Sequence, residues 1–196
     1  MTAQVGDKFF MKGKNYSIVA MTTPLEFHPS KLGITPQYVT TACWAGFWCV
    51  YNVTEEGIFL KDLYVNSKDD NYPKIEGIDA IEEEPNSYSY MGHHLYKNLN
   101  MKIDYTGKIL VGRNFINEYY IHMGYQRPWA YEVLIELVFE NGKLIEKNDE
   151  SNTAEELRKQ LKNEESLLKK GEENISKFVN NSFSLDYNTK AWWLIE

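Results

Sequence analysis

The length and charge of this chain restrict what it can be. It has 196 residues, of which 43% are hydrophobic, and a formal net charge of -7 at pH 7. This length fits one domain, or one domain with an appendage, and supports a core without a metal or disulfide. The acidity argues against nucleic-acid binding, which needs a basic surface. No apolar run is long enough for a membrane span or a secretory signal, so we expect a cytoplasmic protein.

The first third of the chain predicts antiparallel strands. Lys8–Met11 and Tyr16–Met21 flank a KGKN turn and predict a hairpin. A loop rich in proline follows, and strands are then expected over Tyr38–Trp44, Trp48–Val53 and Ile58–Val65. Together these three strands would form a meander.

Two more hairpins are predicted further along the chain. One pairs Asn100–Tyr105 with Lys108–Asn114, and the other pairs Ala130–Glu140 with Lys143–Lys147 over Asn141–Gly142. An Asn-Gly pair between such runs is a strong hairpin signal, because a type I′ turn needs positive φ at both central residues. The segment between the hairpins, residues 115–125, fits either a strand or a short helix.

The character of the chain changes near its C-terminal end. Thr153–Asn180 is charged and predicts a helix, with Thr153 and Glu156 matching a capping box. The tail Phe183–Glu196 contains two adjacent tryptophans and is expected to dock on the body of the fold. We therefore expect a mainly β (α+β) fold, a strongly bent antiparallel sheet or sandwich of hairpins with a C-terminal helical segment. Residues 1–150 would be the β domain, with 151–196 packed on it as one domain overall.

The two cysteines predict packing rather than chemistry. Cys43 and Cys49 flank the turn expected at Trp44–Phe47, so a hairpin would bring them together. Free buried thiols are favoured over a disulfide in a reducing cytoplasm. Cys43 as a nucleophile would need a base, for which His28 or His122 is available, but no local pattern indicates activation.

A metal site and a cofactor are not expected. His93 and His94 are adjacent, and neighbours on a strand point to opposite faces, so both rarely bind one metal. A loop would allow it with Asp79 or Glu118, yet no metal-binding spacing supports this. Phosphate-binding and dinucleotide-binding glycine patterns are also lacking.

The sharpest charge imbalance lies between Ile75 and Tyr96, which contain five carboxylates and no lysine or arginine. Carboxylates interleaved with tyrosines suit recognition of a basic protein, although a solvated loop would have the same composition. The residues of this predicted partner-binding face are Asp69, Asp70, Tyr72, Glu82, Glu83, Glu84, Tyr88 and Tyr90. The favoured function is an acidic protein-binding module of the immunity or antitoxin kind. It would block a basic effector protein, without contact to nucleic acid or membrane.

The alternative is a small-ligand-binding protein or an enzyme. Glu118 would act as a base beside His122 in a cleft that Tyr119, Tyr120 and Trp129 complete. Convergence of Glu118, His122 and another titratable group in one pocket would favour this alternative.

Residues 38–66 carry a resemblance. The segment has Thr41-Ala-Cys-Trp44, then Gly46, then a strand ending in Tyr51-Asn-Val53, then Gly57-Ile-Phe-Leu-x-Asp-Leu63. It resembles a motif in uncharacterised bacterial proteins that have a T-A-C/L-W-R-G turn before two strands. Here Ala45 replaces the usual arginine of that turn. The resemblance implies a β-rich fold and a bacterial origin. Some of those proteins look like accessory proteins of toxin systems.

Overall fold

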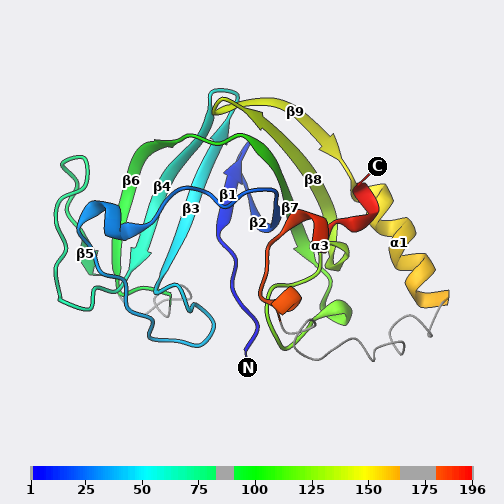
Figure 1. The fold of residues 1–196 in the computed structure, drawn as a ribbon, viewed down its shortest axis with the longest axis horizontal. Helices are drawn as coiled ribbons and strands as arrows, with labels where there is room; N and C mark the ends of the chain where they lie inside the picture. Colours follow the sequence, from blue (N-terminus) through cyan, green and yellow to red (C-terminus); the bar gives the residue numbers. More distant parts are fainter. Residues whose placement is uncertain (1, 83–90, 164–179, 196) are drawn as a thin grey trace.

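One mixed sheet organises the molecule (Figure 1). The computed structural model describes residues 2–82, 91–163 and 180–195. Within them the strand order is β5-β6-β4-β3-β1-β2-β7-β8-β9, and β1 pairs with β3 in parallel while the other neighbours are antiparallel. The strands are β1 (Lys8–Met11), β2 (Lys14–Met21), β3 (Phe47–Thr54), β4 (Gly57–Val65), β5 (Ile81–Glu82), β6 (His94–Ile103), β7 (Gly107–Phe115), β8 (Tyr131–Glu140) and β9 (Lys143–Asp149). A mainly β fold built from one bent sheet is confirmed.

The helices are short. Their bounds are α1 (Ser151–Asn163) and α3 (Tyr187–Lys190), with 3-10 turns η1 (Pro29–Leu32), η2 (Asn117–Tyr119), η3 (Pro128–Ala130) and η4 (Trp192–Leu194). Helix α1 packs on β8, while α3 packs on β2 and β7. Among the described residues, no helix combines the length and apolar character that crossing a membrane requires.

The sheet bends into an arch whose two hairpin tips meet at the top (Figure 1). The turn between β3 and β4 touches the turn between β8 and β9 so closely that a Cβ built on Gly57 would lie 2.0 Å from the carbonyl oxygen of Gly142. Asn141 and Gly142 have φ of 49° and 74°, which confirms the predicted tight turn. The arch stays open at its other end, because β5 and β9 do not pair.

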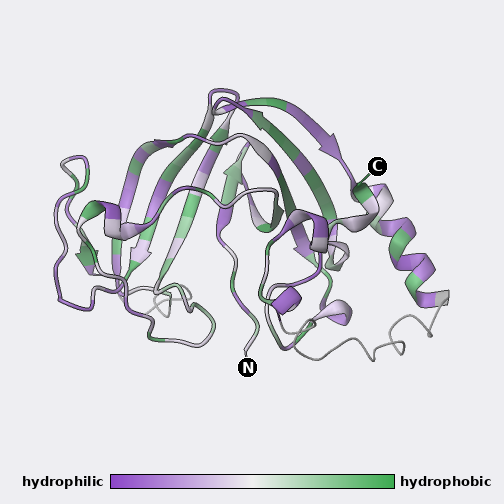
Figure 2. Cartoon of the chain, viewed as in Figure 1, coloured by the Kyte–Doolittle hydropathy of each residue, from purple (hydrophilic) through white to green (hydrophobic). Residues whose placement is uncertain are grey.

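Strand alternation divides the core between the two faces of the sheet. Ile18, Ile109 and Leu137 belong to the larger apolar cluster, whereas their neighbours Val19 and Leu110 belong to a second one. The larger cluster contains residues from both limbs of the arch, so it fills the concave face. The loop after β2 covers it there (Figure 1). The second cluster lies on the other face, where α1 and α3 pack. Figure 2 shows the resulting alternation of green and purple along the strands.

The strand expected at Tyr38–Trp44 is wrong. These residues form a loop in which Tyr38 and Trp44 are 65% and 53% exposed. The loop turns back on itself, since the Gly46 amide donates to the carbonyl of Cys43 (3.3 Å) and Gly46 adopts a φ of 74°. Cys43 therefore lies in a loop and Cys49 in β3, so the hairpin between the cysteines is also wrong. Both are buried and free.

Two other boundaries differ from the sequence prediction. β6 begins at His94 instead of Asn100, because positive φ at Asn98 and Asn100 accommodates a bulge that interrupts its alternation. α1 begins at Ser151, where Asp149 Oδ1 accepts from both the amide and the hydroxyl of Ser151. The capping box at Thr153 is therefore wrong. The remainder of the predicted helix, to residue 179, lies outside the described residues.

Candidate functional site

A cavity with two adjoining lobes opens on the concave face of the arch. The lobes have volumes of about 280 and 390 Å³, within the usual range for small-ligand sites when taken together. They share five lining residues, which are Asp7, Phe47, Tyr125, Phe183 and Leu185. Most of the shared wall is aromatic or aliphatic, and Asp7 is its one carboxylate. This is the chemistry of a site for an apolar molecule with one polar group.

Four parts of the chain, distant in sequence, build the shared wall. Asp7 precedes β1, Phe47 begins β3, Tyr125 lies in the loop before η3, and Phe183 with Leu185 come from the C-terminal tail. The tail is fixed by its backbone, since the Met21 amide donates to the carbonyl of Leu185 (2.8 Å). The Phe183 ring stacks on Trp44, with ring centroids 5.1 Å apart.

Asp7 is held in the cavity by backbone contacts. Its Oδ1 accepts from the amide of Cys49 (2.9 Å), and its carbonyl accepts from the amide of Ile18 (3.0 Å). The residue keeps part of its surface open to the cavity, although protein surrounds its carboxyl group. Burial raises the pKa of this carboxyl to about 7, against smaller lowering effects of the Cys49 amide and the Lys8 charge. Asp7 therefore titrates near neutral pH.

The cysteine thiols near Asp7 are not activated nucleophiles. Burial, and after it the negative charge of Asp7, raises the pKa of Cys43 to about 11 and the pKa of Cys49 well above its usual value. The Cys43 Sγ donates to the carbonyl of Phe47 (3.1 Å). A thiol held in this way is protonated at neutral pH, and the thiolate is the reactive form.

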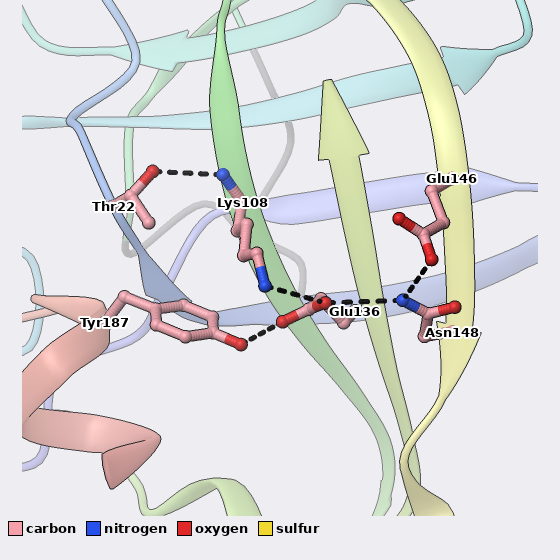
Figure 3. A network of polar contacts seen from close by, with 6 residues as sticks. All are labelled: Thr22, Lys108, Glu136, Glu146, Asn148 and Tyr187. Carbon is pink, nitrogen blue, oxygen red and sulfur yellow. Dashed lines mark hydrogen bonds and ion pairs between the residues drawn. The ribbon is translucent and has the colours of Figure 1, made fainter. Parts of the chain in front are cut away.

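A second polar cluster lies on the other face of the sheet (Figure 3). Glu136 on β8 is 5% exposed, accepts from the hydroxyl of Tyr187 and pairs with Lys108 Nζ (3.4 Å). Asn148 Nδ2 donates to the same carboxylate (3.4 Å) and to Glu146 Oε1 (3.1 Å). Burial, followed by the hydrogen bond to Glu136, raises the pKa of Tyr187. Because every charge in it has a partner, this cluster serves to anchor α3 on the sheet.

The same helix carries a fully buried lysine. Lys190 is 0% exposed, and its Nζ donates to the carbonyl oxygens of Tyr125 and Ser182, both at 3.4 Å. Burial, followed by the charge of Arg127, lowers the pKa of Lys190 to about 7. The contact with Tyr125 ties the tail to the loop that lines the cavity.

The residues of the predicted partner-binding face differ in exposure, and only some of them lie in the described part of the chain. Asp69, Asp70 and Glu82 are exposed, whereas Tyr72 is half-buried. The Tyr72 ring stacks on His94, and its hydroxyl accepts from the amide of Ser67 (3.0 Å), so this tyrosine is a packing residue. The other four predicted residues, Glu83, Glu84, Tyr88 and Tyr90, lie outside the described residues.

The residues of the predicted catalytic alternative do not converge on the cavity. Glu118 is exposed and pairs with Lys162 of α1 (3.0 Å), and this contact lowers the pKa of its carboxyl. His122 is exposed and packs edge-on against Tyr120. Neither lines the two lobes around Asp7. The same holds for His93 and His94, and the described residues contain no cluster of histidine, cysteine and carboxylate side chains that could hold a metal.

Comparison with known proteins adds no relative: no family model, no curated protein sequence and no solved structure matches this chain.

Proposed function

We propose that this chain binds a small, largely apolar organic molecule in the two-lobed cavity of its concave face. The observation that carries the proposal is the shared wall, where Phe47, Tyr125, Phe183 and Leu185 surround a single carboxylate, Asp7. Apolar walls with few polar groups are typical of ligand sites, because burial supplies affinity and the polar group supplies orientation. Bound ligand would bridge the segment before β1, the strand β3 and the tail.

Titration with an uncharged fluorophore tests this function. We expect N-phenyl-1-naphthylamine to bind with saturable 1:1 stoichiometry and increased emission. Leu185→Trp should weaken binding at least tenfold, because the indole would occupy space that both lobes share. Ile145→Trp, at a residue on β9 that is 58% exposed, is the matched control and should leave the dissociation constant unchanged. Emission that never saturates, or equal affinity in both variants, would contradict the proposal.

Recognition of a basic protein, in the manner of a cytoplasmic immunity protein, is a second proposed function. The observation that favours it is the exposure of Asp69, Asp70, Glu82 and the apolar Ile81 at one end of the sheet. The charge there is reduced in one place, since Lys74 pairs with Asp79 (2.9 Å).

Replacement of three exposed carboxylates tests this second function. The triple variant Asp69→Asn, Asp70→Asn, Glu82→Gln should retrieve less of any basic partner than the wild type, most clearly at low salt, because rim charges act on the encounter. Its free energy of unfolding should change by less than about 0.5 kcal/mol per site, as is usual for surface residues. Equal yields with equal salt sensitivity would remove the support for a binding face.

A further inference from the structure

The carboxylate in the cavity is incompletely paired. Asp7 Oδ1 accepts from the Cys49 amide, whereas Oδ2 forms no hydrogen bond or ion pair within the described part of the chain and, since it is not a fully buried atom, is open to the cavity. A carboxylate that protein surrounds normally has several hydrogen bonds or an ion partner, since burying a charge without one is costly. Asp7 lines both lobes, so a molecule in either one can reach it.

The cavity offers no cation of its own. Among the described residues, no lysine or arginine lines either lobe, and the second acidic residue there, Asp186, is engaged at the start of α3 by the Thr189 amide and hydroxyl. Lys8 follows Asp7 in the chain, but alternation along β1 turns it to the opposite face, where its Nζ donates to Ser17 Oγ (2.5 Å). The local field in the cavity is therefore negative.

The walls suit a positive charge as well as an apolar body. Six aromatic rings line the lobes, and the faces of such rings attract ammonium and guanidinium groups. They are Phe27, Trp44, Phe47, Tyr51, Tyr125 and Phe183.

We propose that the ligand of this cavity is an organic cation, an apolar body carrying a protonated amine that binds the free oxygen of Asp7. This inference rests on the proposed ligand-binding function and specifies its substrate class. The ammonium would supply the missing partner of Asp7, and the apolar body would fill the lobes beyond it.

The titration of Asp7 makes this pairing dependent on pH. An ammonium binds the ionised carboxylate, and the raised pKa of Asp7 means that about half a proton is displaced per amine bound at pH 7. Affinity for the amine should therefore rise between pH 6 and 7.5 and then level off. The other titratable groups that face Asp7 or the walls are Cys43, Cys49, Tyr51, Tyr125, Asp186 and His28, whose ring packs on Phe47, and the charge of Lys8 acts on Asp7 from the opposite face.

Three probes with one hydrocarbon body test the inference by calorimetry at pH 7.5. They are 2-naphthylmethylamine, 2-naphthylmethanol and 2-naphthoate. We expect the amine to bind at least tenfold more tightly than the alcohol, and the naphthoate more weakly than both. Asp7→Asn should abolish the preference for the amine while the alcohol still binds. Asp70→Asn, at an exposed residue with a φ of 51° that asparagine tolerates, is the control and should keep the preference.

The outcomes separate this inference from the function on which it rests. If the alcohol binds as tightly as the amine, or if Asp7→Asn still prefers the amine, the proposal that the ligand is a cation is wrong. The proposed binding of a small molecule would then still stand. If none of the three probes binds, both proposals fail. Proton release by the wild type, measured in buffers of different ionisation enthalpy, provides a second readout that does not depend on the folding of any variant. An affinity for the amine that stays constant from pH 4 to pH 8, with no proton released anywhere in that range, would overturn the pairing with Asp7. Parallel measurements on His28→Gln identify any proton that comes from the imidazole.

Discussion

Replacing Gly57 with alanine should lower the free energy of unfolding by more than about 3 kcal/mol, through backbone strain and a clash together. Gly57 has a φ of 128°, which residues with a Cβ rarely adopt, and its Cβ would lie 2.0 Å from the Gly142 carbonyl oxygen. A backbone atom of a neighbouring tight turn cannot move aside as a side chain can. The substitution should therefore separate the two hairpin tips. Urea denaturation monitored by circular dichroism provides the measurement.

Gly13→Ala is the matched control. Gly13 also lies in a hairpin turn at positive φ, 75°, but a Cβ there would meet no atom within 4 Å. Its substitution carries only the conformational cost, about 1–2 kcal/mol. The difference between the two variants measures the contact at the top of the arch together with the greater backbone strain at a φ of 128°, and equal destabilisation would show that the tips do not touch.

Asp7→Asn should stabilise the protein at pH 8 and leave its stability unchanged near pH 4. The folded-state pKa of Asp7 is raised from 3.8 to about 7, so the native state retains a proton that the unfolded state loses. Stability is consequently lost as pH rises from about 4 to about 7, and the loss is constant above that. The full pKa shift corresponds to a change of roughly 4 kcal/mol in the free energy of unfolding. Because Asp7 is partly open to the cavity, solvent screens its charge, and we expect a change of about 2–3 kcal/mol. The asparagine oxygen can still accept from the Cys49 amide.

The measurement is a pair of denaturation series from pH 4 to pH 9. Lys190 produces a pH dependence of its own, because its lowered pKa makes stability rise with pH between about 7 and its ordinary value of 10.5. The difference between variant and wild type at each pH removes this contribution, since Lys190 is common to both. A difference that does not vary with pH would show that Asp7 is ionised at acidic pH.

Turn chemistry explains what could be predicted from the sequence. The Asn141-Gly142 turn and the strands on either side of it follow from a local requirement for positive φ, and the structure has both. The strand predicted at Tyr38–Trp44 is wrong because the apolar residues there suggest a strand, whereas the structure leaves Tyr38 and Trp44 exposed in a loop. Local composition cannot show whether a partner strand will cover such residues.

The cavity could not be predicted, because segments far apart in the chain build its wall. One local signal was available. Asp7 and Phe9 are two residues apart at the start of a predicted strand, so Asp7 points to the same face as a core residue. The position of the tail could not be predicted in this way, since the sequence predicts that the tail docks on the fold but not where it docks.

The position of β1 and β2 in the centre of the sheet sets the order in which the chain can assemble. This hairpin joins one limb of the arch through β3 and the other through β7, which lies some ninety residues further along the chain. It is synthesised before the other strands of the sheet, with both edges able to pair, and must wait for strands made later. Folding therefore depends on contacts between distant residues, which typically makes it slow and leaves unpaired edges open to other chains.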